Sequence, residues 1–245
     1  MAAFAPEAIF HIGSFPVTNT IINTLLVDAG LVGTAYYIKT HIKKVPGIFQ
    51  NTLEMVMQSF YETTEVVSGK NAAKIFPFFM TFFLFILFAN WSNLIPGIGT
   101  FGFVASGEHG KTEIIPFIRG ATSDANTTFA LAIFSLLATH ILAIRAVGIG
   151  EYLSRYFSLN PIMLFVGILE IVSEFTKVVS LSFRLFGNIF AGEVVMHTVS
   201  SLFAFLAPVP FLLLEIIVGL VQALVFAMLT MVFMSVLMTP HHQEH

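Results

Sequence analysis

The segment SLSFRLFGNIFAGE, Ser180 to Glu193, places charged side chains inside one of the most apolar parts of the chain. Arg184 stands out, because an arginine does not lose its proton at physiological pH. In an apolar medium it can attract a carboxylate and at the same time bar protons from passing. A structural alternative is that Arg184 pairs within a helix bundle or extends to an interface. Its type and position therefore indicate either an ion path or a packing contact.

Carboxylates and amides near Arg184 could form a proton relay. Glu215 and Gln222 share one face of a later apolar helix through the i, i+4, i+7 rule. Two antiparallel helices would bring Glu193 near Glu215, with Asn188 and Gln222 in the same polar seam. Buried carboxylates with polar neighbours suit proton transfer. Hydrogen bonding between helices is the alternative role for Asn188 and Gln222.

Helical spacing sorts these charges into two faces. At 100° per residue, one polar stripe about 80° wide is formed by Glu170, Glu174, Lys177, Arg184 and Asn188. Glu193 and His197 fall on nearly the opposite side. This two-sided pattern predicts one face toward a partner and another toward an interior path.

Composition identifies a membrane protein. Of 245 residues, 56% are hydrophobic and 10% are charged, against roughly 25% charged residues in soluble domains. The net charge of -3 gives no reason to expect nucleic-acid binding. The absence of cysteine excludes disulfides, iron-sulfur clusters and thiol nucleophiles. No cofactor or metal is expected, since the histidines lack the spacing of a metal site. The N-terminus also lacks the pattern of a cleavable signal peptide.

The apolar stretches predict a single membrane domain over residues 1–245. Its expected parts are a first span at 16–38, a cytoplasmic or interfacial segment at 45–74, a second span at 76–95, an outer loop at 97–126, a third span at 127–147, and a tilted helical hairpin at 161–238. The fold class is therefore all-α and polytopic, with about five membrane helical segments.

Residues 162–206 contain no proline and would extend roughly 65 Å as a helix, about twice the thickness of a membrane. They form either two spans with a turn near Gly187 or Gly192, or one strongly tilted helix. The basic residues of the loops gather on one side, at Lys39, Lys43, Lys44, Lys70, Lys74, Arg145 and Arg155, against Lys111 and Arg119 on the other. This bias predicts an outer N-terminus and a cytoplasmic C-terminus.

The residues resemble those of subunit a of the F-type ATP synthase, the stator part of its membrane motor. Arg-Leu-Phe-Gly-Asn followed by Ala-Gly-Glu is a specific signature, and FPVTNT, NLIPG, SDANTTFALA and LVQALVFAMLT follow the family order. The resemblance covers essentially the whole chain. It implies a non-catalytic subunit in a bacterial plasma membrane, whose long C-terminal hairpin lies along a rotor ring.

The resemblance also implies roles for particular residues. Arg184 would be the essential charge that faces the ring carboxylate. The proton path would include Glu193, Glu215, Asn188, Gln222, Asp124, Asn126 and Glu170. Some members of the family have histidine at the position of Glu215, so the combination of Glu193 with a second carboxylate departs from the pattern of those members. Glu174 and Lys177 would line the path or pack beside it.

Implied partners are the ring subunit c, the peripheral stalk subunit b, other ATP synthase subunits and membrane lipid, with no nucleic acid. Protons would enter from outside past Asp124, Glu193 and Glu215, ride on the ring, and leave near Glu170. The transported ion is H⁺ or Na⁺, because its binding site belongs largely to the ring. The alternatives are an unrelated ion-coupled secondary transporter, which usually shows internal repeats that this chain lacks, and a purely structural membrane subunit.

Overall fold

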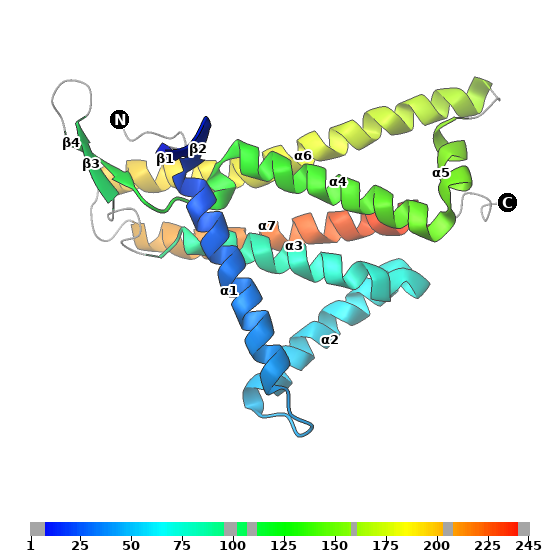
Figure 1. Cartoon of the computed structure of the whole chain (residues 1–245), viewed down its shortest axis with the longest axis horizontal. Coiled ribbons are helices and arrows are strands. Elements are labelled where there is room, and N and C mark those ends of the chain that lie inside the picture. Colours follow the sequence, from blue (N-terminus) through cyan, green and yellow to red (C-terminus); the bar gives the residue numbers. More distant parts are fainter. Residues whose placement is uncertain (1–7, 96–101, 107–111, 158–160, 203–207, 240–245) are drawn as a thin grey trace. The chain divides into compact units, whose positions relative to one another are not determined.

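A computed structural model of the chain describes residues 8–95, 102–106, 112–157, 161–202 and 208–239. Helices dominate these residues, which confirms the all-α class (Figure 1). In chain order they are α1 Asn19–His41, α2 Ile48–Ser68, α3 Ala72–Ser92, α4 Ala125–Val147, α5 Ile149–Tyr156, α6 Pro161–Leu202 and α7 Pro208–Leu237. Two short 3-10 turns, η1 Gly69–Asn71 and η4 Ala121–Ser123, precede α3 and α4.

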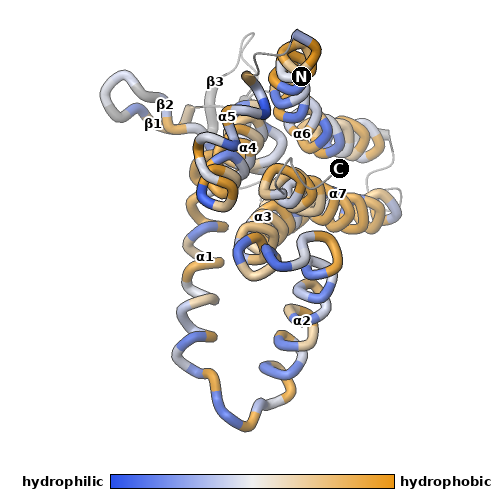
Figure 2. Tube along the Cα trace, turned by 90° about the vertical axis from the view of Figure 1, so that its right-hand side faces the viewer, coloured by the Kyte–Doolittle hydropathy of each residue, from blue (hydrophilic) through white to orange (hydrophobic). Residues whose placement is uncertain are grey.

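Four helical stretches of the described residues are long and apolar enough to cross a membrane. They lie at Asn19–His41, within Ile48–Ser92, at Ala125–Val147 and at Pro208–Leu237. Figure 2 shows α3 and α7 as hydrophobic along nearly their whole length, whereas α2 alternates hydrophobic and hydrophilic residues. The protein is therefore a multi-pass membrane protein.

Two small antiparallel hairpins add to the helices. Strand β1, Ala8–Ile12, pairs with β2, Phe15–Thr18. Strand β3, Gly102–Ser106, pairs with β4, Thr112–Pro116. The segment 97–126, expected as a loop, thus contains a hairpin, while residues 96–101 and 107–111 lie outside the described part. Helix α1 begins three residues after the predicted start of the first span, because Pro16 belongs to β2.

Helix α6 resolves the alternative posed by the long apolar segment. It runs without a break for 42 residues, so no turn interrupts it at Gly187 or Gly192. Proline opens both this helix and α7, at Pro161 and Pro208, where the missing N–H would have had no helical partner. Residues 203–207, between the two helices, are outside the described part.

The chain divides into two compact units that both draw on α3, α4, α6 and α7. Unit 1 comprises residues 1–40, 84–128 and 184–223. Unit 2 comprises residues 41–83, 129–183 and 224–245. Each unit is therefore built from three pieces of the chain that are separate in sequence.

Unit 1 is held together by polar contacts between distant segments. Asn19, Thr20 and Asn23 of α1 are buried. The Asn23 side chain donates to Ser92 Oγ at 2.9 Å, and that of Asn19 donates to the Pro116 carbonyl at 3.3 Å. The polar residues that weaken the apolar pattern of the first span therefore anchor the start of α1, since a buried polar group is costly unless it is bonded.

Aromatic side chains join the helices of unit 2. The ring of Phe60 in α2 lies 5.5 Å from that of Phe79 and 5.0 Å from that of Phe83, both in α3. Phe82 of α3 contacts Phe226 of α7, with ring centroids 5.6 Å apart. Such tilted pairs are favoured by the aromatic quadrupole. Phe79, Phe82, Phe83 and Phe226 are all buried, so they form part of the apolar core of this unit.

A corner in unit 2 depends on two glycines. Gly148 ends α4 with a positive φ of 91° and donates its N–H to the Ile144 carbonyl at 3.0 Å. Helix α5 then turns back so that the Tyr156 carbonyl lies against Gly167 of α6, where an added Cβ would overlap it. Burial raises the pKa of the Tyr156 phenol, so this hydroxyl stays protonated at neutral pH.

Candidate functional site

In unit 1, Glu193 of α6 is held by two donors from outside its own helix. Arg119 Nη2 lies 3.2 Å from Glu193 Oε2 in a salt bridge whose side chains are only 10% and 17% exposed. Asn93 Nδ2 donates to Glu193 Oε1 at 3.0 Å. Both carboxylate oxygens therefore have a donor from another segment of unit 1.

The segment that carries Arg119 is itself anchored. Arg119 Nε donates to Ser123 Oγ at 3.3 Å, and this hydroxyl donates to the Gly120 carbonyl at 2.9 Å. Thr122 Oγ1 donates to Asn90 Oδ1 at 2.7 Å. A rotamer-rich arginine side chain is thus ordered by the turn before α4, so its guanidinium has a defined position beside Glu193.

Glu215 of α7 lies against Gly192 of α6. A Cβ at position 192 would overlap the Glu215 carboxylate, so the glycine makes room for it. Glu215 is half-buried and close enough to Glu193 for the two to interact electrostatically. The structure thus brings together the two carboxylates that helical spacing placed on facing helices.

The backbone around Glu215 is fixed by residues of α3. Asn90 Nδ2 donates to the Gly219 carbonyl at 3.1 Å, and Trp91 Nε1 donates to the Ile216 carbonyl at 3.2 Å. The first of these bonds is buried. Because both carbonyls belong to the backbone of α7, the two side chains set how α7 lies on α3 within unit 1.

Asn188 and Gln222 meet as the sequence predicts. Asn188 Nδ2 donates to Gln222 Oε1 at 2.8 Å, joining α6 to α7. Arg184 lies one turn before Asn188 and is exposed, as Asn188 is. Glu174, placed by helical spacing on the same stripe, is buried in unit 2 instead, with 7% exposure. The stripe therefore is not one uniform surface, because different neighbours cover different turns of so long a helix.

Asp124, expected on the proton path, also caps the start of α4. It is 7% exposed and precedes α4, where its Oδ1 accepts from the Asn126 backbone N–H at 2.9 Å. Its Oδ2 accepts from Thr20 Oγ1 at 3.2 Å. This is the geometry of an N-cap, which satisfies a free donor of the first helical turn. The Asn126 side chain is exposed.

The remaining expected path residue, Glu170, belongs to unit 2. Arg155 Nε of α5 lies 3.8 Å from Glu170 Oε1, and Arg155 Nη2 donates to the Thr239 carbonyl at 3.3 Å. Among the described residues, no group of three or more His, Cys, Asp and Glu side chains is placed to hold a metal ion.

The sequence alone did not single out several members of this site. Arg119, Asn90 and Asn93 carry much of the bonding around Glu193 and Glu215, yet Arg119 is 74 residues away from Glu193 in the chain. No local spacing could reveal such a pair. Asn90 and Asn93 did carry a signal, because they are amides at the end of a very apolar helix.

Similarity to known proteins extends over nearly the whole chain. A family profile described as ATP synthase A chain matches residues 18–235. ATP synthase subunit a of Moorella thermoacetica is 32% identical over 235 residues, which cover 96% of this chain and 97% of that protein. ATP synthase subunit a 2 of Pelobacter propionicus is 32% identical, covering 94% and 90%. ATP synthase subunit a 1 of Hahella chejuensis is 32% identical, covering 92% and 86%. With this match over nearly its full length, the chain belongs to the ATP synthase A chain family.

Proposed function

We propose that this chain is the membrane stator subunit of an F-type ATP synthase, which loads protons onto a rotor ring and unloads them. The observation that carries the proposal is the arrangement in unit 1. The Glu215 carboxylate lies against Gly192, the residue before Glu193, and Arg184 is exposed nine residues before Glu193 on the same unbroken helix. This arrangement supports a relay through two carboxylates, with a permanent charge at another position on the same helix.

The carboxylates and the arginine have complementary tasks. Glu193 and Glu215, with Asp124, Asn126, Asn188 and Gln222 near them, would pass protons from the outer side. Arg184 would face the carboxylates of ring subunit c. Because it stays charged, it would stabilise their ionised form and make each arriving carboxylate release its proton. The released proton would leave past Glu170, which belongs to the other unit.

The length of α6 supports a tilted position along the ring. Its 42 residues extend about 63 Å, whereas a hydrocarbon core is about 30 Å thick. An upright helix of this length would leave apolar residues outside the membrane. Many large apolar side chains of α6 are exposed, among them Phe165, Phe175 and Phe183. Lipid or neighbouring subunits would cover such a surface.

The free energy needed to make one ATP exceeds what one proton supplies by crossing the membrane. One elementary charge crossing the membrane supplies about 2.3 kcal/mol per 100 mV, so several protons are needed for each ATP. ATP chemistry would take place on other subunits, with which this chain assembles. We further propose stalk subunit b as a partner and a bacterial plasma membrane location, with the N-terminus outside and the C-terminus in the cytoplasm.

The decisive experiment replaces Arg184 in the whole ATP synthase complex reconstituted in vesicles. Arg184→Ala should abolish ATP-driven proton pumping and proton-driven ATP synthesis while the complex still assembles. The matched control is Arg145→Ala, the same change at the exposed end of α4, which should retain both activities. Intact pumping by assembled Arg184→Ala complexes would refute the proposed function.

A further inference from the structure

Helix α1 of unit 1 carries a carboxylate near the middle of its membrane-spanning stretch. Asp28 lies nine residues after the first residue of this 23-residue helix, about 14 Å along its axis. Its side chain is exposed, and within the described part of the chain no hydrogen bond or ion pair joins it to another residue. Asp28 is also not one of the residues expected on the proton path. Its place in the span therefore needs another explanation.

A carboxylate at this depth is costly if only lipid surrounds it. Half of a hydrocarbon core is about 15 Å thick, and a short aspartate side chain cannot reach a headgroup as lysine and arginine can. Charged residues inside membrane spans almost always face another protein group or a water-filled cavity. Something other than lipid tails should therefore meet Asp28.

Asp28 belongs to a row of residues with the spacing of a helix–helix contact. The row comprises Leu25, Asp28, Val32 and Ala35, which are three, four and three positions apart. We call it the Asp28 row; it covers about 80° of the helix surface at 100° per residue. Leu25 and Val32 are 61% and 69% exposed. Asn19 and Asn23, which anchor α1 within unit 1, lie on the opposite side of the helix.

The charge decides between the possible occupants of this row. Only 6% of the spanning stretch of α1 is buried inside the chain, so the row is open to a neighbour. Lipid tails offer no donor to Asp28. A second copy of this chain, packed about a two-fold axis, would place Asp28 beside its own copy, and like charges repel. A membrane helix with a basic side chain would supply both a donor and the opposite charge.

We propose that the Asp28 row packs against a membrane helix of a neighbouring ATP synthase subunit, and that a basic side chain of that helix bonds Asp28. A single polar residue in an otherwise apolar contact fixes the register of the two helices. Asp28 would thus set the depth at which the neighbouring helix lies beside α1. This inference goes beyond the proposed proton path, because it uses none of its residues and requires only that the chain assembles with other subunits.

The test identifies what lies against the row in the whole ATP synthase complex in lipid nanodiscs. Val32 is replaced by a diazirine-bearing amino acid, and the product of illumination is mapped by mass spectrometry. The expected product joins position 32 to a membrane helix of another subunit, with a lysine, arginine or histidine within one helical turn of the contact. A product with lipid alone, with a second copy of this chain, or with a helix that lacks a basic residue would overturn the proposal.

Variants at position 28 test the charge. Asp28→Asn keeps the size of the side chain without its charge, and Asp28→Leu removes the acceptor as well. The crosslink yield at position 32 per assembled complex should fall several-fold in Asp28→Asn and further in Asp28→Leu. The matched control places the diazirine at Leu26, which is 53% exposed on another side of α1, and there the yield should not change. An unchanged yield at position 32 in Asp28→Asn would contradict a basic partner. Mapping with Asp28 in place decides the question even where a variant assembles poorly.

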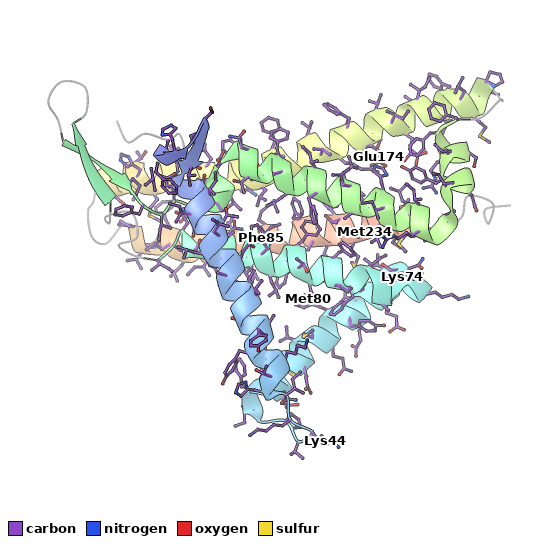
Figure 3. All side chains as sticks on the ribbon, in the orientation of Figure 1. Lys44, Lys74, Met80, Phe85, Glu174 and Met234 are labelled. Carbon is purple, nitrogen blue, oxygen red and sulfur yellow. The ribbon has the colours of Figure 1, made fainter. Side chains whose placement is uncertain are left out.

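Two further arms exclude water and separate this contact from the proposed function. Val32→Cys introduces a thiol into a chain that has no cysteine. A water-soluble maleimide should modify it much more slowly than Lys44→Cys in the loop between α1 and α2, where Figure 3 shows Lys44. Equal rates would place the row in a water-filled cavity and refute the contact. Arg184→Ala should abolish pumping and leave the crosslink at position 32 unchanged; if pumping is lost but no such crosslink forms in either chain, only the contact falls.

Discussion

Unit 1 and unit 2 both bury charged side chains, but they use different chemistry. In unit 1 the cation paired with Glu193 is Arg119, which holds its proton at all physiological pH values. In unit 2 the groups near Glu174 are Lys177, whose Nζ lies 2.7 Å from Oε1, and His140, whose Nε2 lies 4.0 Å from Oε2. Glu193 thus lies beside a permanent cation, whereas Glu174 has an imidazole nearby, a group that can gain or lose a proton near neutral pH.

The two units also differ in how the charged pairs arise. Arg119 and Glu193 are joined across 74 residues by the fold of unit 1. Glu174 and Lys177 lie three residues apart on one helix, so α6 alone brings them together. A long-range pair depends on the whole unit being folded, whereas an i,i+3 pair forms wherever the helix forms. Unit 1 should therefore respond more strongly to loss of a charge.

The largest effect is expected for Arg119→Gln. Removing one partner of a largely buried ion pair leaves the other charge uncompensated and costs about 3 kcal/mol. We expect a clearly lower thermal stability of the complex and a large loss of proton flux. Arg119→Lys should be intermediate, because an ammonium keeps the charge but cannot bond Ser123 and Glu193 in the same fork. Arg145→Gln, at an exposed site, is the control. If Arg119→Gln were as stable and active as the control, unit 1 would not depend on its long-range ion pair in the way we expect.

Gly167→Ala tests the packing of unit 2 with no charge involved. The added methyl would overlap the backbone carbonyl of Tyr156, which cannot rotate away, so α5 or α6 must shift. Overpacking of this kind costs about 1 to 3 kcal/mol. Thermal unfolding should show the loss. Gly150→Ala places the same methyl in open space on α5 and should be nearly neutral; equal losses in both variants would contradict the close approach.

Gly192→Ala makes the corresponding change in unit 1, where the methyl meets the side chain of Glu215. Because a carboxylate can swing aside, the stability loss should be smaller than at Gly167, about 1 kcal/mol. Proton flux should fall more than stability, since Glu215 is displaced from Glu193. Flux and thermal stability measured together distinguish the two effects. Gly30→Ala, with open space on α1, is the control, and equal flux in both variants would argue against a role for Glu215.

The smallest effects compare one interhelical hydrogen bond from each unit. Asn188 bonds Gln222 at 2.8 Å in unit 1, and Ser135 bonds Thr230 at 2.8 Å in unit 2. Double-mutant cycles with alanine should give a coupling of about 0.6 kcal/mol for each bond. Proton flux should fall only for the Asn188 and Gln222 variants. A loss of proton flux in the Ser135 and Thr230 variants alone would contradict the placement of the outer proton path in unit 1.

Much of the architecture follows from local sequence. The apolar stretches predict the helices, since a span needs about 20 apolar residues. The pairing of Asn188 with Gln222 was predicted from helical periodicity, because two antiparallel helices bring equal spacings together. The hairpin at β3 and β4 was missed, because a polar segment rich in Gly, Thr and Ser reads as a loop unless its partner strand is known.

The sequence by itself determined the membrane class, the family and which charged residues stand in apolar surroundings, because hydropathy, periodicity and a signature motif are local properties. Only the tertiary structure decided which of these charges are paired. Arg119 reaches Glu193, Asp124 caps α4, and Asn93 donates to Glu193. The physical reason is that a buried charge is stabilised by whatever donor the fold brings within about 3 Å, and no sequence spacing encodes a contact between separate helices.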